Sequence, residues 1–179
     1  MKKKRQENIK NSTLKVAMFG ILIALQIVIA QFLTIRPTDQ IKISLSFIPV
    51  VIASRLFGAL GAGLIAGIGD VLQAFLFPVG AWFPPITITT VLVGIVFGLF
   101  LKNSNKFISI LISVLITELI ISLFITPIWL YMLRGTDYWL ILFSRLPQIG
   151  IMIAVKLAII PPVLKMTDRI NIFKKKKEQ

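Results

Sequence analysis

Residues 58–70 of the chain are GALGAGLIAGIGD, and residues 77–87 are FPVGAWFPPIT. The first stretch is apolar, rich in glycine and ends on a carboxylate, Asp70. The second is dense in prolines and aromatic residues, which is unusual for a passive linker, and a further apolar stretch follows it up to Leu101. Together these features predict a small-molecule site between closely packed helices of a membrane protein.

The composition of the whole chain supports a membrane protein. Hydrophobic residues make up 56% of its 179 residues, and the mean hydropathy is +0.90. A soluble domain of this size cannot bury that much apolar surface in one core. The surrounding solvent is therefore expected to be lipid.

The apolar pattern predicts an all-α integral membrane protein with a single domain over residues 1–179. Crossing about 30 Å of hydrocarbon takes about 20 helical residues. The second predicted segment is shorter, so we expect it to be tilted, bent or shielded by its neighbours. No cleavage site of the signal-peptide type follows the first segment, so we expect that helix to be retained. The six predicted transmembrane helices span about 14–34, 44–57, 60–77, 86–101, 107–131 and 141–166.

Charge sets the predicted orientation, because cytoplasmic segments of membrane proteins carry an excess of Lys and Arg. Six crossings place both termini on one side, and most of the 20 cations lie in the basic tails, 1–13 and 167–179, or in turns on that side. Both termini are thus expected to be cytoplasmic, with the ligand pocket near the extracellular face. The net charge of +13 then reflects topology and attraction to anionic lipid. Nucleic acid is not an expected partner.

Several remaining cations cluster toward the predicted outer face. Arg36, Lys42 and Arg134 lie near helix ends, where long side chains reach water, so each is either structural or a ligand contact. Arg145 lies about one turn inside the last helix. An unpaired cation there costs about 2.5 kcal/mol or more. We therefore expect Arg145 to face a partner or a water-filled cavity.

Two carboxylates, Asp70 and Glu118, lie within apolar spans, and each needs a cation, a hydrogen-bond donor or a proton. For Glu118 we expect an internal pair with Lys156 or with a neighbouring hydroxyl. Asp70 has Gln73 three residues later on the same helical face. A carboxylate beside an amide can recognise the donor and acceptor edge of a flat heterocycle, so we expect both residues to contact a ligand.

The segment between the third and fourth predicted helices is expected to form a lid or a stacking wall over that ligand. Prolines restrict its backbone, while Trp82 and Phe83 offer flat apolar faces. The alternative is an ordinary belt of aromatic residues at the membrane interface. The predicted lid residues around this aromatic pair are Pro78, Gly80, Pro84 and Pro85.

Small residues recur at helical spacing in two places. Gly63 and Gly67 lie four residues apart and predict close helix packing. Ala17, Gly20 and Ala24 mark one face of the first predicted helix. Their spacing alone allows either an internal seam or a docking surface for another membrane subunit.

The residue types present argue against an enzyme and against a resident cofactor. The chain contains no His and no Cys, which removes the commonest general base, the thiol nucleophile and the usual transition-metal ligands. The glycine-rich stretch lacks the Lys and the Ser or Thr of a nucleotide-binding phosphate loop. An acid and base pair formed by Asp70 and Glu118 is the remaining enzymatic alternative.

The run from Leu33 to Leu101 resembles the folate-family substrate-binding S component of energy-coupling factor (ECF) vitamin transporters. The resemblance rests on the Asp of the third helix, on FPVGAWFP and on the Thr before a Gly-containing fourth helix. SRLPQIGIMIAV also resembles the Arg-x-Pro segment of that family, with Arg145 and Pro147 at the matching positions. Gln148 follows, where a basic residue often stands in the family.

This resemblance implies a six-helix membrane protein that captures folate outside the cell. It implies that a transmembrane coupling subunit and two cytoplasmic ATPases complete the transporter, with Gly20 and Ala24 in the docking seam. Folate has a flat pterin, an aromatic linker and two carboxylates. The pterin suits Asp70 and Gln73, and the linker suits the lid aromatics. The carboxylates suit the outer cations, Arg36, Lys42 and Arg145.

Two other classes stay open at this point. An S component for a different flat heterocycle, such as a thiamine precursor, would keep the lid and the seam of the first helix without requiring the outer cations. A membrane scaffold or a lipid-modifying enzyme would need none of these features.

Overall fold

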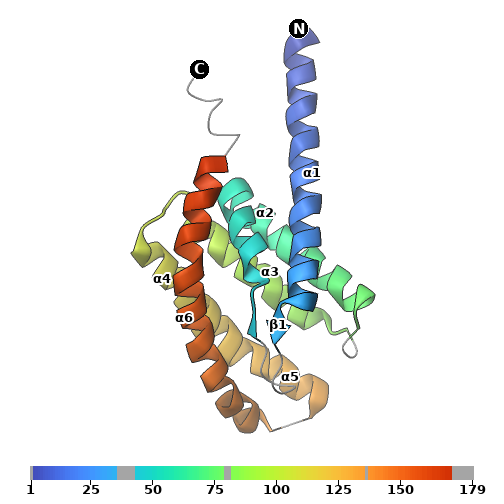
Figure 1. Ribbon diagram of the computed structural model, residues 1–179. Coiled ribbons are helices and arrows are strands. Elements are labelled where there is room, and N and C mark those ends of the chain that lie inside the picture. Colours follow the sequence, from blue (N-terminus) through green and yellow to red (C-terminus); the bar gives the residue numbers. More distant parts are fainter. Residues whose placement is uncertain (1, 36–42, 79–81, 136, 171–179) are drawn as a thin grey trace.

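The computed structural model describes residues 2–35, 43–78, 82–135 and 137–170, with side chains from residue 13 to 169 outside the gaps and position 134. Within this part of the chain, five helices are long and apolar enough to cross a membrane (Figure 1). The elements are α1 (Lys2–Phe32), β1 (Thr34–Ile35), β2 (Ile43–Ser44), α2 (Phe47–Leu76), α3 (Pro84–Leu101), α4 (Phe107–Leu115), the π-helix η1 (Ile116–Ile125), α5 (Thr126–Arg134) and α6 (Tyr138–Ile170).

The mostly helical membrane architecture agrees with the prediction, and α2 shows how two predicted segments join. Predicted segments 44–57 and 60–77 lie on the two sides of Gly58, which breaks α2 with φ 77° and ψ −162°. Glycine accepts this left-handed backbone without strain. Elsewhere, α1 and α6 extend beyond their predicted bounds. The two-residue antiparallel pair of β1 and β2, with Thr34 opposite Ser44, was not predicted.

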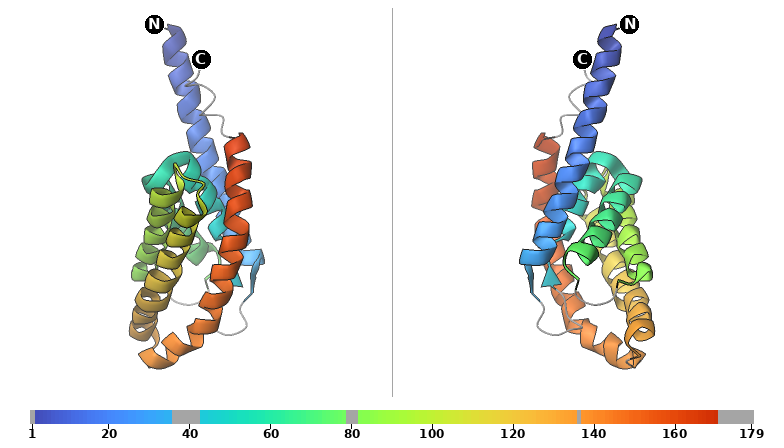
Figure 2. Two further views of the ribbon diagram at one scale, coloured as in Figure 1. Left: turned by 90° about the vertical axis from the view of Figure 1, so that its left-hand side faces the viewer. Right: turned by 90° about the vertical axis from the view of Figure 1, so that its right-hand side faces the viewer.

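The helices form two layers. Seen from the side in Figure 2, α1 and α6 lie on one side and α3 and α4 on the other. The first turns of α1 project beyond the rest of the bundle, and the last turns of α6 lie at the same end (Figure 1). The β1 and β2 pair and α5 lie toward the opposite end. The bundle therefore has a terminal end and a hairpin end.

The second arm of α2 and the helix α3 pack closely through glycine, as predicted for Gly63 and Gly67. A Cβ atom added at Gly63 would lie 2.9 Å from a side-chain carbon of Ile95. From the other helix, a Cβ atom at Gly94 would lie 2.5 Å from the carbonyl oxygen of Ala62. One at Gly98 would lie 2.2 Å from the Cα atom of Ala59. The two backbones are in contact, so no larger residue fits between them.

A polar network fixes the terminal end of the bundle. Arg55 of α2 donates two hydrogen bonds to the carboxylate of Asp168 on α6, at 2.6 and 2.9 Å. It also donates to the carbonyl oxygens of Leu101 and Lys102, at 3.0 and 2.8 Å, where α3 ends. Asn105 donates to the same Asp168 carboxylate. One guanidinium group thus joins α2, α3 and α6.

Candidate functional site

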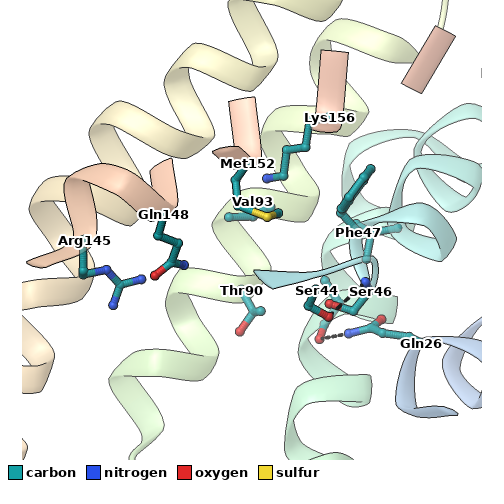
Figure 3. A pocket seen from close by; sticks show the side chains of 12 residues that line it. Gln26, Ser44, Ser46, Phe47, Thr90, Val93, Arg145, Gln148, Met152 and Lys156 are labelled. Carbon is teal, nitrogen blue, oxygen red and sulfur yellow. Dashed lines mark hydrogen bonds between the residues drawn. The ribbon is translucent and has the colours of Figure 1, made fainter. Parts of the chain in front are cut away.

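A cavity of about 220 Å³ lies between the two layers of the bundle, where five elements meet. Its wall is mixed, with hydroxyl, amide and cationic side chains among apolar ones (Figure 3). Both layers contribute to this wall. The lining residues are Gln26 of α1, Ser44 of β2, Ser46 before α2, Phe47, Val50 and Ala66 of α2, Thr90 and Val93 of α3, and Arg145, Gln148, Met152 and Lys156 of α6.

A second cavity of about 210 Å³ adjoins the first and shares Thr90, Val93 and Lys156 with it. Lys156 is paired with Glu118 of η1, with 2.6 Å between Nζ and Oε1. Both side chains are less than a tenth exposed. The ammonium group also lies over the rings of Phe47 and Phe97, at 5.6 and 5.2 Å from their centroids. The predicted internal pair of Glu118 is confirmed, and its cation separates the two cavities.

Arg145 is the second cation on the cavity wall and has fewer partners. Its side chain is 8% exposed, and its Nη2 atom donates one long hydrogen bond, 3.4 Å, to the hydroxyl of Ser122. Its Nε atom is buried without a hydrogen-bond partner among the described residues. In that same part of the chain, no carboxylate lies within ion-pair distance of the guanidinium. The expectation that Arg145 faces a cavity is confirmed.

Gln148 lies one helical turn after Arg145 on α6 and lines the same cavity. Its side chain is 5% exposed. The spacing of three residues places both groups on one face of the helix. Of the residues predicted to bind a ligand, these two are the ones that the structure brings to this cavity.

Asp70 lies outside the lining of either cavity, at the end of the second arm of α2. Its Oδ2 atom accepts a hydrogen bond of 2.7 Å from the hydroxyl of Thr87 on α3. The same hydroxyl accepts a hydrogen bond of 3.2 Å from Trp82 Nε1. The Trp82 ring also contacts Phe75, with centroids 5.6 Å apart. These contacts hold the two ends of the predicted lid segment together.

The other predicted lid and ligand residues lie near this group and not on the cavity wall. Gln73 is half-buried, and Pro78 is exposed. Phe83 precedes α3, with its ring centroid 6.5 Å from that of Trp129. Pro84 and Pro85 occupy the first turn of α3, where the missing N–H of proline costs nothing. Three other predicted positions, Arg36, Lys42 and Gly80, lie outside the described residues.

The small residues of α1 lie on its outer face. Ala17, Gly20 and Ala24 are all exposed. A Cβ atom added at Gly20 would meet no described atom within 4 Å. The stripe therefore does not form an internal seam with the described part of the chain.

Sequence reasoning missed the neutral polar residues of the cavity wall. Gln26 is the single polar side chain between Val16 and Ala30, and that isolation was the available signal. Ser44 and Ser46 reach the cavity through the pairing of β1 with β2. No periodic pattern indicates such a short strand pair.

The family model for "ECF-type riboflavin transporter, S component" matches residues 10–167. The chain belongs to this family. Its relatives include a folate transporter FolT of Clostridium novyi (strain NT), 34% identical over 155 residues that cover 86% of this chain and 90% of the relative. A folate transporter FolT of Leuconostoc mesenteroides subsp. mesenteroides is 27% identical over 131 residues, covering 72% and 70%.

A solved structure described as FolT bound with folic acid has the same fold as this S component. The TM-score is 0.80, with 26% identity, and the match covers 87% of this chain and 97% of that one. The family consists of transporter components and not of enzymes, which confirms the prediction that this membrane protein carries out no reaction of its own. The resemblance to S components of ECF transporters is also confirmed.

Proposed function

We propose that this S component binds folate outside the cell and delivers it inward with an ATP-driven ECF module. The observation that carries the proposal is the buried guanidinium of Arg145, whose Nε atom lacks a hydrogen-bond partner on the wall of the cavity. Buried charges are normally paired, so an anionic group of the ligand is the expected partner. The FolT relatives point to folate as that ligand.

Charge also separates folate from the other vitamins considered. The matching family model is described by riboflavin, which has no carboxylate, and thiamine is a cation. Glu118 already neutralises Lys156, whereas Arg145 has no carboxylate within ion-pair distance in the described part. The wall therefore favours an anion over a neutral or cationic heterocycle. Riboflavin or another flat heterocycle is the second candidate.

Within this proposal the predicted site residues have two roles. Arg145 and Gln148 bind the ligand in the cavity, with Arg36 and Lys42 as further cations for its carboxylates. Asp70 and its hydrogen-bonded neighbours hold the lid segment, and the flat faces of that segment cover the ligand. The proposed lid group, with Asp70 included, consists of Asp70, Gln73, Pro78, Gly80, Trp82, Phe83, Pro84 and Pro85.

The proposed topology has six crossings in the bacterial cytoplasmic membrane, with the two arms of α2 counted separately. The terminal end of the bundle carries the basic tails of the sequence, so it faces the cytoplasm. The hairpin end, where Ser44 lines the cavity, then faces outward. This orientation places the cavity near the extracellular side.

The proposed partners are a transmembrane coupling subunit and two cytoplasmic ATPases, as the family resemblance implies. The exposed stripe of Ala17, Gly20 and Ala24 is the proposed docking seam. Small side chains let a partner helix approach the backbone of α1 closely.

Replacing Arg145 by Ala tests the anion site. Removing a charge-assisted hydrogen bond of about 1.5–3 kcal/mol should weaken folic-acid binding by about ten- to a hundredfold in isothermal titration. Lys165→Ala is the matched control, because Lys165 is an exposed cation on the same helix, outside both cavities. A folded Arg145→Ala variant that binds folic acid as tightly as the wild type would remove Arg145 from the site.

A further inference from the structure

Gln26 is a buried amide in the middle of an apolar helix. Its side chain is 5% exposed, and it lines the same cavity as Arg145. Figure 3 shows the two residues on opposite sides of the view, Gln26 reaching in from α1 and Arg145 from α6. A ligand in the cavity therefore lies between an amide and a guanidinium group.

The hydrogen bonds of Gln26 fix which of its atoms is free. Its Nε2 atom donates to the carbonyl oxygen of Ala66, at 3.2 Å. Exchanging the amide oxygen and nitrogen would put two acceptors together, so this orientation is set by the neighbour. Its Oε1 atom is then left buried without a hydrogen-bond partner among the described residues. A buried carbonyl oxygen without a donor is unfavourable unless a ligand supplies one.

Gly69 gives this amide its place. A Cβ atom at Gly69 would lie 2.7 Å from the amide carbon of Gln26 and 2.8 Å from both its oxygen and its nitrogen. Any larger residue would displace the amide. The contact also keeps Gln26 against α2 while its oxygen lacks a partner.

A hydroxyl donor lies on the same wall. The Oγ atom of Ser44 accepts hydrogen bonds from Thr34 Oγ1, at 2.7 Å, and from the backbone N–H of Ser46, at 3.2 Å. With its acceptor positions used, its own O–H remains to be donated. Figure 3 places Ser44 on the Gln26 side of the view. This side of the cavity thus offers an acceptor together with a donor.

We infer that Gln26 recognises the heterocycle of the ligand, with Oε1 accepting a hydrogen bond from a ring or amino N–H, while Arg145 binds the carboxylate at the other end. The inference rests on the proposed function and gives folate one orientation in the cavity. The pterin has N–H donors beside a carbonyl acceptor, which match Gln26 Oε1 and the Ser44 hydroxyl. The glutamate end then lies toward α6.

The test is titration of the full-length, detergent-purified chain with folic acid for the wild type, Gln26→Met and Gln31→Met. Gln31 is the matched control, because it lies on the same helix outside the cavity lining. Methionine keeps the length of the side chain and removes the amide. We expect Gln26→Met to weaken folic-acid binding about tenfold or more and Gln31→Met to leave it unchanged. Elution profile and melting temperature show that each variant is folded.

Competition by pteroate, which carries the heterocycle without glutamate, locates the lost contact. Pteroate should displace folic acid from the wild type and lose affinity in Gln26→Met by a similar factor. Unchanged folic-acid binding in Gln26→Met, or failure of pteroate to compete on the wild type, would overturn the inference. So would a loss confined to Asp70→Asn. Absence of folic-acid binding by the wild type would instead overturn the proposed function itself.

Discussion

Lys156 and Glu118 form a buried ion pair on the wall between the two cavities. Removing two charges from water is costly, and the close contact of 2.6 Å repays that cost only while both partners are present. The rings of Phe47 and Phe97 add a favourable surface for the ammonium group. The pair therefore fixes η1 against α6 beside the site, and it leaves Arg145 as the cation open to a ligand.

Glu118→Gln should destabilise the protein by about 3–5 kcal/mol, because it leaves Lys156 charged and buried without its partner. Thermal unfolding in detergent, followed by tryptophan fluorescence, measures this change. The double variant Glu118→Gln/Lys156→Met removes both charges and should recover most of the loss. A single variant as stable as the wild type would show that the pair contributes nothing to folding.

Sequence reasoning identified the charged residues of the cavity wall but not the neutral ones. A charge inside an apolar span is costly, so Arg145, Glu118 and Lys156 stand out in the sequence. Gln26 and Ser44 carry no charge, and the desolvation cost that would mark them is smaller. Asp70 stands out equally, yet the structure satisfies it with Thr87, a neighbour that spacing along one helix could not reveal.

At the scale of elements, the contact between α2 and α3 gives the bundle its closest packing. The glycines that make it were visible in the sequence as a small-residue pattern. The break in α2 was visible only as a boundary between two segments. Its cause is the left-handed backbone of Gly58, beneath the Lys102 side chain; an added Cβ atom would lie 2.8 Å from Lys102 Cδ.

Gly98→Ala should destabilise the protein by about 1–3 kcal/mol, because the new methyl group meets the backbone of Ala59 and forces the helices apart. Gly150→Ala is the matched control: Gly150 also lies in a helix, but a Cβ atom there would meet no described atom within 4 Å. The control should change stability by at most about 1 kcal/mol, in the stabilising direction. Equal melting temperatures for the two variants would contradict the close packing.

The π-helix η1 was not predicted from the sequence, in which 107–131 forms one apolar run. The signal present was Pro127, because proline cannot donate to the preceding turn and crowds it. The hydroxyl of Thr126 bonds to the carbonyl oxygen of Ile121, five residues earlier, at 3.0 Å. The wider turn includes Glu118 and Ser122, which both line the second cavity.

For the whole molecule, the account depends on which surface faces lipid and which faces a partner. Large apolar side chains are exposed over the bundle, among them Val16 at 70%, Leu60 at 79% and Phe143 at 61%. Such a surface suits lipid. The stripe on α1 differs, because its small residues leave the backbone accessible. This contrast supports the proposal that α1 meets the coupling subunit.

Ala24→Trp should prevent co-purification of the coupling subunit while leaving folic-acid binding intact, since the bulky side chain blocks helix approach without touching the cavity. Ile108→Trp is the control, at an exposed position on α4, which lies apart from α1 in Figure 1. Affinity pull-down of the co-expressed subunits measures the effect. A complete complex with Ala24→Trp would place the docking seam elsewhere.

The most direct test of the account is isothermal titration of the purified chain, stripped of carried-over ligand, with folic acid, riboflavin and thiamine in parallel. We predict tight one-to-one binding of folic acid alone, because the unpaired guanidinium on the cavity wall selects an anion. Binding of riboflavin or thiamine in place of folic acid would keep the S-component architecture and contradict the proposed substrate.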